Sequence, residues 1–144
     1  GLETIEPAYE GHFDLITSNI PFGDVSLFDP AFSSSRDPVR RQGAWAIHNY
    51  FFMKSVDLVR AGGLIAFITS QGMADAERNR PVREWLMERC DLVAAVRLPN
   101  NLFTDHAGTE VGSDLIVLQK NSAARSPSGS GTLSKRARSR TALR

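Results

Sequence analysis

The chain has 144 residues, of which 42% are hydrophobic, and it carries 17 basic and 16 acidic side chains. This length allows one domain or part of one, and the composition excludes a compositionally disordered or fibrous chain. The longest uninterrupted apolar run, residues 64–68, is far shorter than the ~20 residues of a membrane-spanning helix. Together with a polar, acidic N-terminal segment, this pattern predicts a soluble cytoplasmic protein that makes no contact with a membrane.

Cysteine and histidine residues give no sign of a metal site. Cys90 is the only cysteine, which excludes an intrachain disulfide and a cysteine-based zinc site. His12, His48 and His106 have no metal-ligand spacing and are interpreted as surface or packing residues. Because no histidine is close to it in sequence, Cys90 is interpreted as a packing residue rather than a nucleophile.

The charge distribution divides the chain into three parts. Residues 1–12 are a polar lead-in, residues 13–120 contain the apolar runs, and all acidic residues lie at or before Asp114. Residues 121–144 are rich in Ser, Gly and Ala and carry only basic charges. This tail is either a disordered end that happens to be positive or a segment that binds nucleic acid, and we favour the first interpretation.

The first half of the chain is predicted to contain one strand, a long loop and one helix. Residues 13–18 have the β-branched and aromatic bias of a strand. Residues 24–43 are predicted to be a loop, with substrate contact and simple solvation as alternatives. Apolar residues at helical spacing predict a helix over residues 44–60, with Trp45 in the core and with Gly62 and Gly63 ending the helix.

The second half alternates strands and a helix. Residues 64–69 have the pattern of a parallel strand that is buried on both faces. Ser70-Gln71 is interpreted as a turn rather than a catalytic pair, and Asn79 with Pro81 starts a second helix that places Trp85 in the core. Further strands are predicted at residues 92–98 and 114–118.

This order predicts an α/β fold with a mostly parallel sheet and helices on both faces. In such sheets the ligand crevice lies at the carboxyl ends of the strands. Asn19 and Ser70 each come just after a predicted strand end, and Pro99 comes after a third. We therefore expect a functional site where the first strand ends.

The segment Ser18-Asn19-Ile20-Pro21-Phe22 lies at that position. It resembles the (Asn/Asp)-Pro-Pro-(Tyr/Phe) motif of class I S-adenosylmethionine-dependent amino-methyltransferases and departs from it at Ile20. The order of the later segments is similar to the N6-adenine DNA methylase family, which includes modification subunits of type I restriction systems and helicase-linked methylase domains. The segments that carry this resemblance are residues 61–68, 83–86, 96–99, 103 and 114–120.

The resemblance implies a role for each motif residue in methyl transfer to the N6 amine of a flipped adenine. The side-chain oxygen of Asn19 and the backbone carbonyl of Ile20 would accept hydrogen bonds from the amine, and Asn19 would also lie beside the cofactor, S-adenosylmethionine. Pro21 would restrain the turn. Phe22 would stack on the flipped base, and Gly23 would let the backbone pass close to it.

The resemblance covers residues 13–120 and implies a partial Rossmann-like methyltransferase sheet that lacks the N-terminal cofactor-binding strands. No strand with a glycine-rich loop precedes Phe13. The implied partners are DNA and the missing N-terminal half or another subunit. Three alternatives stay open, namely a truncated non-catalytic fragment or DNA-binding piece, methylation of cytosine N4 or of a protein glutamine, and a purely structural role for Asn19, Pro21 and Phe22.

Overall fold

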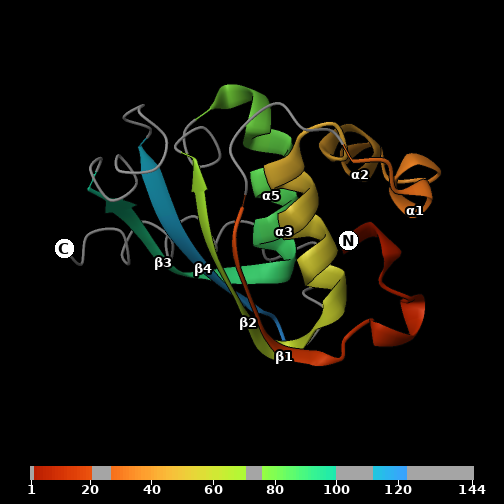
Figure 1. Ribbon diagram of the computed structural model, residues 1–144, viewed down its shortest axis with the longest axis horizontal. Helices are drawn as coiled ribbons and strands as arrows, with labels where there is room; N and C mark the ends of the chain where they lie inside the picture. The colour runs from red at the N-terminus through yellow and green to blue at the C-terminus, as the bar shows by residue number, and fades with distance from the viewer. Residues whose placement is uncertain (1, 21–26, 71–75, 100–111, 123–144) are drawn as a thin grey trace.

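A four-stranded sheet with helices α3 and α5 packed on one of its faces forms the centre of the computed structural model (Figure 1). The structure describes residues 2–20, 27–70, 76–99 and 112–122. None of the helices within these ranges is long and apolar enough to cross a membrane.

The lead-in contains two short 3-10 helices, η1 (Leu2–Thr4) and η2 (Pro7–Tyr9), and is followed by strand β1 (Phe13–Asn19). Two backbone hydrogen bonds attach the start of β1 to the end of α3: Gly11 N donates to Asp57 O at 2.8 Å, and His12 N donates to Leu58 O at 2.9 Å. The predicted first strand is therefore confirmed and extends one residue further, to Asn19.

Two short helices, α1 (Pro30–Ser33) and α2 (Pro38–Gly43), occupy much of the segment that was predicted to be a loop. Each begins with an Asp-Pro pair. Asp29 Oδ1 accepts a hydrogen bond from Ala31 N, and Asp37 Oδ1 accepts one from Val39 N. An aspartate N-cap followed by proline is a strong helix start, so the loop prediction was wrong over these residues.

Helix α3 (Ile47–Leu58) leads directly into strand β2 (Val59–Ser70). The prediction that Gly62 and Gly63 end the helix was wrong, because both glycines lie inside β2. Residues 60–63 bulge out of the pairing with β1, whose register changes between Phe13 and Leu15. Gly62 has a φ of 79°, a conformation that side chains with a Cβ rarely adopt, so the glycine pair serves this bulge instead.

The rest of the chain supplies η3 (Glu77–Asn79), α5 (Arg80–Arg89), β3 (Cys90–Leu98) and β4 (Ser113–Lys120). The second predicted helix and both later strands are confirmed, with each strand one or two residues longer at its ends. β3 follows α5 without a connecting loop.

The strand order is β1-β2-β4-β3, and the sheet is mixed. β1 and β2 are parallel, whereas β4 runs antiparallel to both β2 and β3. The prediction of a mostly parallel sheet was therefore wrong. β1 and β2 are joined through α3, as parallel neighbours require, but β3 and β4 are consecutive strands that pair directly in opposite directions.

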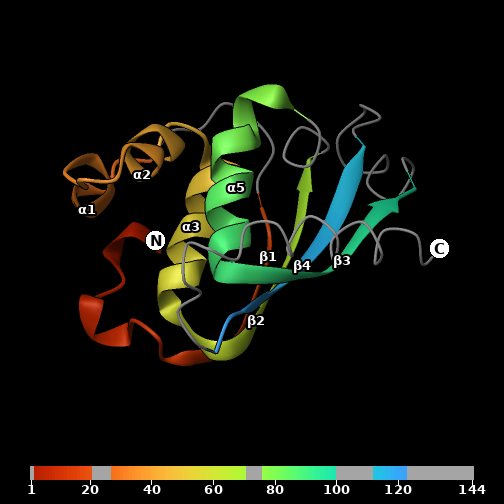
Figure 2. The same cartoon turned by 180° about the vertical axis from the view of Figure 1, so that it is seen from behind.

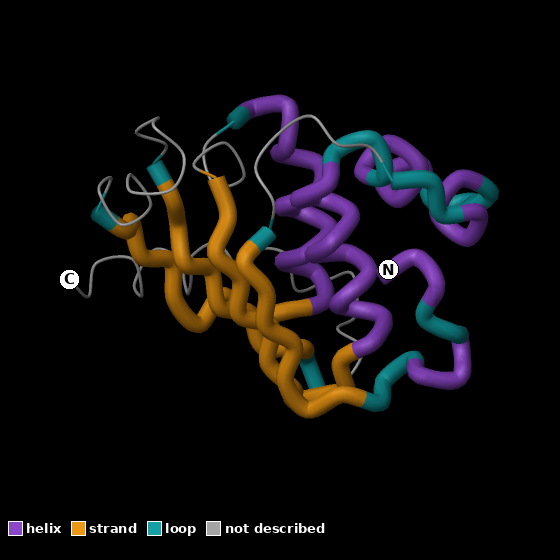
Figure 3. Tube along the Cα trace, viewed as in Figure 1, coloured by secondary structure: helices purple, strands orange, loops and turns teal. Residues whose placement is uncertain are grey.

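Helices cover one face of the sheet among the described residues, not both as predicted (Figures 2 and 3). Burial alternates along β2, where Ile65 and Phe67 face the helices in the core and Leu64, Ala66 and Ile68 are only partly buried. The prediction that this strand is buried on both faces was wrong for the same reason. We call the side of the sheet opposite to α3 and α5 the open face.

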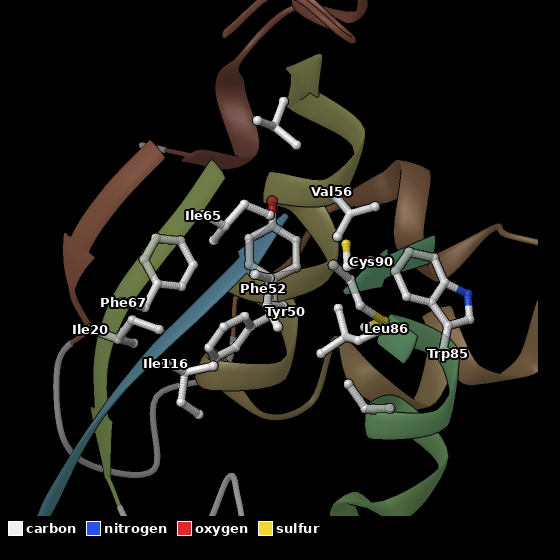
Figure 4. Close-up of a cluster of buried hydrophobic side chains, with 14 of the residues drawn as sticks. Ile20, Tyr50, Phe52, Val56, Ile65, Phe67, Trp85, Leu86, Cys90 and Ile116 are labelled. Atoms are coloured by element: carbon white, nitrogen blue, oxygen red, sulfur yellow. The ribbon is translucent and has the colours of Figure 1, made fainter. Parts of the chain in front are cut away.

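The core lies between the sheet and the two helices (Figure 4). Trp85 and Cys90 belong to it, as predicted. Trp45 does not: it lies just before α3, and 79% of its surface is exposed. The residues labelled in the close-up view are Ile20, Tyr50, Phe52, Val56, Ile65, Phe67, Trp85, Leu86, Cys90 and Ile116.

The bulge in β2 gives a stability prediction. A Cβ atom on Gly63 would lie 2.6 Å from Val59 Cγ2 and 2.9 Å from Asp14 O, so Gly63→Ala is expected to lower the free energy of unfolding by about 1–3 kcal/mol. Ala61→Ser, at an exposed position of the same strand, should change it by less than about 0.5 kcal/mol. Urea unfolding measures both, and an unchanged midpoint for Gly63→Ala would contradict the close packing.

Candidate active site

Asn19 is the last residue of β1 and its side chain is exposed. It pairs with Ile68 of β2, and strand alternation places both side chains on the open face. No hydrogen bond joins the Asn19 side chain to any residue that the structure describes. Its amide is therefore presented at the carboxyl end of the parallel pair, at the place where the sequence predicted a site.

Ile20 is held more firmly than a loop residue would be. Its side chain is fully buried in the core, next to Phe67 in Figure 4, and its backbone N donates to Ile68 O at 3.0 Å. Pairing with β2 thus continues one residue past the end of β1. Proline, which the family motif has at this position, lacks the N–H group for this bond, so the departure at Ile20 adds an anchor to the backbone.

Pro21, Phe22 and Gly23 lie outside the described residues. Their roles in restraining the turn, stacking on a base and allowing close approach of the backbone remain predictions. The structure brings Asn19 and Ile20 together at one strand end, and the next described residue is Leu27.

Asp29 anchors the chain again soon after the motif. Its carboxylate is buried and accepts hydrogen bonds from Tyr50 Oη at 2.7 Å and from Lys54 Nζ at 3.3 Å, both on α3. Burial acts to raise the pKa of Asp29, but these donors together with Ala31 N outweigh it and hold that pKa below its usual value. The motif is therefore followed by a charged anchor that attaches α1 to α3.

A second polar group of residues lies where β2 ends. Ser70 Oγ is 3.5 Å from His48 Nε2, and the neighbouring Asn49 Nδ2 donates to Asn79 Oδ1 at 3.0 Å. Burial lowers the pKa of His48, which favours a neutral imidazole. Within the described ranges, the buried oxygens Asn49 Oδ1 and Thr69 Oγ1 have no hydrogen-bond partner. This end of the sheet is polar and not fully satisfied by its own groups.

The end of β3 carries an ion pair at the same edge of the sheet. Arg97 Nε donates to Asp114 Oδ1 at 2.6 Å, and Asp114 is buried whereas half of the Arg97 side chain is exposed. Because β4 starts where β2 and β3 end, the pair lies one strand away from Thr69, the register partner of Asp114. No group of three acidic, histidine or cysteine residues within the described ranges could hold a metal ion.

The arrangement of strands and helices resembles solved methyltransferase structures. A modification subunit assigned to a type I restriction enzyme of Vibrio vulnificus YJ016 superposes with a TM-score of 0.63 over 83% of this chain at 17% identity. The M protein of the type I restriction enzyme EcoKI gives a TM-score of 0.56 over 74% of the chain at 20% identity. A protein of Listeria monocytogenes assigned as a class I S-adenosylmethionine-dependent methyltransferase gives 0.60 over 79% at 18% identity. The fold is thus a methyltransferase-like α/β fold.

The sequence profile of the N-6 DNA methylase family matches residues 2–133, and the chain belongs to this family. The resemblance inferred from the motif and the order of segments is thereby confirmed. A search of curated proteins gave no match. This chain spans only 25%, 20% and 33% of the lengths of the three structures above.

The sequence predicted Asn19 as a site residue, and the structure places it at the strand end; the residues that hold the neighbouring segments in place were not predicted. The Asp29 anchor depends on Tyr50 and Lys54, which were interpreted only as part of a helix, and His48 was separated from Ser70 by too many residues for their contact to be predicted. The Asp-Pro pair at Asp29 was the available signal, since it predicts a helix start rather than a loop.

The Asp29 anchor gives a test of how the segment after the motif is held. Tyr50→Phe removes the hydroxyl donor from a buried carboxylate and should lower the free energy of unfolding by about 1–3 kcal/mol. Tyr9→Phe, at a residue that is 44% exposed, should change it by less than about 0.5 kcal/mol. Chemical denaturation of the two variants measures the difference.

The pH dependence of that difference has a definite sign. The folded-state pKa of Asp29 lies below the usual 3.8, so its stabilising effect is present above pH 3.8 and is lost as the pH falls through the lower folded value. The deficit of Tyr50→Phe should therefore shrink in acid. A deficit that grows in acid would contradict an ionised Asp29 in the folded protein.

Proposed function

We propose that this chain forms the target-base side of an N6-adenine DNA methyltransferase, with Asn19 and Ile20 as the two hydrogen-bond acceptors of the amine. The observation that carries the proposal is the end of β1, where an exposed amide is followed by a backbone unit fixed through a buried side chain and a hydrogen bond to β2. Family membership supports DNA as the substrate.

The chemistry explains why two acceptors are needed. The lone pair of an exocyclic adenine amine is delocalised into the ring, which makes the nitrogen a poor nucleophile. Acceptors that bind its two hydrogens favour a nitrogen whose lone pair points away from the ring and toward the methyl donor. Such acceptors act best when they are held in place before the substrate arrives, and the anchoring of Ile20 supports this role.

S-adenosylmethionine is the methyl donor that family membership implies. Among the described residues, Asn19 fits the part of such a site that binds the amine. A binding site for the methyl donor would need a strand and a glycine-rich loop before β1, and the described residues have η1 and η2 there instead. We propose that the donor is held by a part of the protein beyond residues 13–120, and that residues 121–144 are a basic tail outside the catalytic unit.

The open face of the sheet supports an interaction with such a part. It carries partly buried Leu64, Ala66 and Ile68 on β2, and Leu15 on the edge strand β1 is 55% exposed. On β3, Val93 and Val96 are 43% and 48% exposed. The regions that match this chain make up only 20–33% of the three structural neighbours, so we propose that the cofactor-binding half of the catalytic domain covers this face.

The role of Asn19 is tested in the full-length protein with unmethylated DNA. Asn19→Ala should reduce formation of N6-methyladenine by at least about a hundredfold, since one of two preorganised acceptors is lost. Asn121→Ala makes the same chemical change just past the opposite end of β4 and should retain activity. Mass spectrometry of digested DNA measures the product, and full activity of Asn19→Ala in a folded protein would rule out the assignment.

The covered open face is tested by placing a charge on it in the full-length protein. If the other half packs there, Leu15→Glu buries an unpaired carboxylate and should lower the free energy of unfolding by about 2 kcal/mol or more. Phe28→Glu, at a 76% exposed position outside the strands, should have an effect below about 0.5 kcal/mol. Small and equal effects of the two substitutions in thermal unfolding would mean that the face remains in solvent.

A further inference from the structure

Ser70 lies close to the proposed amine site on the neighbouring strand. It is the last residue of β2, two residues beyond Ile68, the register partner of Asn19, and its hydroxyl lies on the side of α3, where it meets His48. A step of two residues along a strand and one strand across corresponds to about 8 Å between Cα atoms.

His48 is the only described side chain at hydrogen-bond distance from the Ser70 hydroxyl. The separation between His48 Nε2 and Ser70 Oγ is 3.5 Å, and the first turn of α3 brings the ring to the end of β2. If Nε2 carries the ring proton, it donates to Ser70 Oγ, and the hydroxyl proton of Ser70 then points away from the ring. Burial lowers the pKa of His48, and one N–H group of the neutral imidazole suffices for this contact.

The surroundings support a binding role for this end of the sheet. Ser70 pairs with Ser113 of β4, and three buried oxygens near these strand ends have no hydrogen-bond partner among the residues that the structure describes: Asn49 Oδ1, Thr69 Oγ1 and Ser113 Oγ. Buried polar atoms are nearly always satisfied in native proteins, so a group of orphaned oxygens at one edge points to a polar ligand or ordered water there.

We propose that Ser70 donates a hydrogen bond to N1 of the adenine, the ring nitrogen next to the target amine. His48 is the positioning residue that orients the Ser70 hydroxyl for this contact. The inference rests on the proposed function, because it takes Asn19 and Ile20 as the contacts of the amine itself. Adenine presents an amine and, beside it, an unprotonated ring nitrogen. Acceptors at the end of β1 would bind the amine, and a donor at the end of β2 would bind the ring nitrogen beside it.

The proposal is tested with the full-length protein and a duplex that carries its own methylation site, mapped by sequencing methylated DNA. The target position holds either adenine or 1-deazaadenine, in which the ring nitrogen is replaced by C–H. The wild-type protein should prefer adenine by about tenfold in kcat/KM, which is the usual effect of one hydrogen bond. Ser70→Ala should lose this preference.

Variants of His48 distinguish a role in orienting the Ser70 hydroxyl from a role in folding alone. His48→Leu should lose the preference for adenine, whereas His48→Gln keeps an N–H donor and should retain most of it. Ser55→Ala, at a buried serine in the middle of α3, is the matched control and should behave as the wild type. Circular dichroism checks that each variant is folded, and Ser70→Thr, which keeps the hydroxyl, gives a second test at that position.

The outcomes distinguish this inference from the function on which it rests. An active wild-type protein whose preference for adenine is unchanged in both Ser70→Ala and His48→Leu would overturn the inference and leave the roles of Asn19 and Ile20 intact. A wild-type protein that methylates neither duplex would overturn the proposed function and this inference with it.

Discussion

The attachment of Ile20 to β2 is the constraint on which the proposed site depends. A fully buried side chain and a hydrogen bond from its N–H group to Ile68 O hold the backbone at the point where the chain leaves the sheet. Asn19, one residue earlier, is held by the strand pairing and yet exposes its side chain. The same peptide segment therefore combines a rigid backbone with an accessible amide, which is what a preorganised pair of acceptors requires.

β2 connects this segment to the rest of the fold. It is the only strand that pairs with both β1 and β4, and its inner residues Ile65 and Phe67 contact the core formed by α3 and α5. α3 in turn contributes Tyr50 and Lys54 to the Asp29 anchor and His48 to the end of β2. The proposed site is consequently supported from one side of the sheet, and no described element covers the open face.

The strands could be predicted from sequence, but the direction of a strand and the exposure of single side chains could not. The apolar runs at residues 64–69 and 114–118 predicted strands, because a strand needs only a short apolar stretch. The direction of β4 did not follow from its composition, since parallel and antiparallel strands share the same residues. The glycine pair was misread because glycine ends helices and also forms bulges, and only the observed φ of Gly62 distinguishes the two. Trp45 lies at helical spacing but precedes the helix, so the periodicity did not apply to it.

The place of Asn19 at a strand end could be predicted from the local sequence. The contacts that hold this strand end and the segment after it come from residues far away in sequence, which local patterns do not reveal.

A structure of the full-length protein bound to its target duplex and a methyl-donor analogue tests the central claim most directly. We expect the amine nitrogen of the target adenine to lie about 3 Å from both Asn19 Oδ1 and the carbonyl oxygen of Ile20. A target amine bound by other residues, with the end of β1 facing away from the base, would contradict the account.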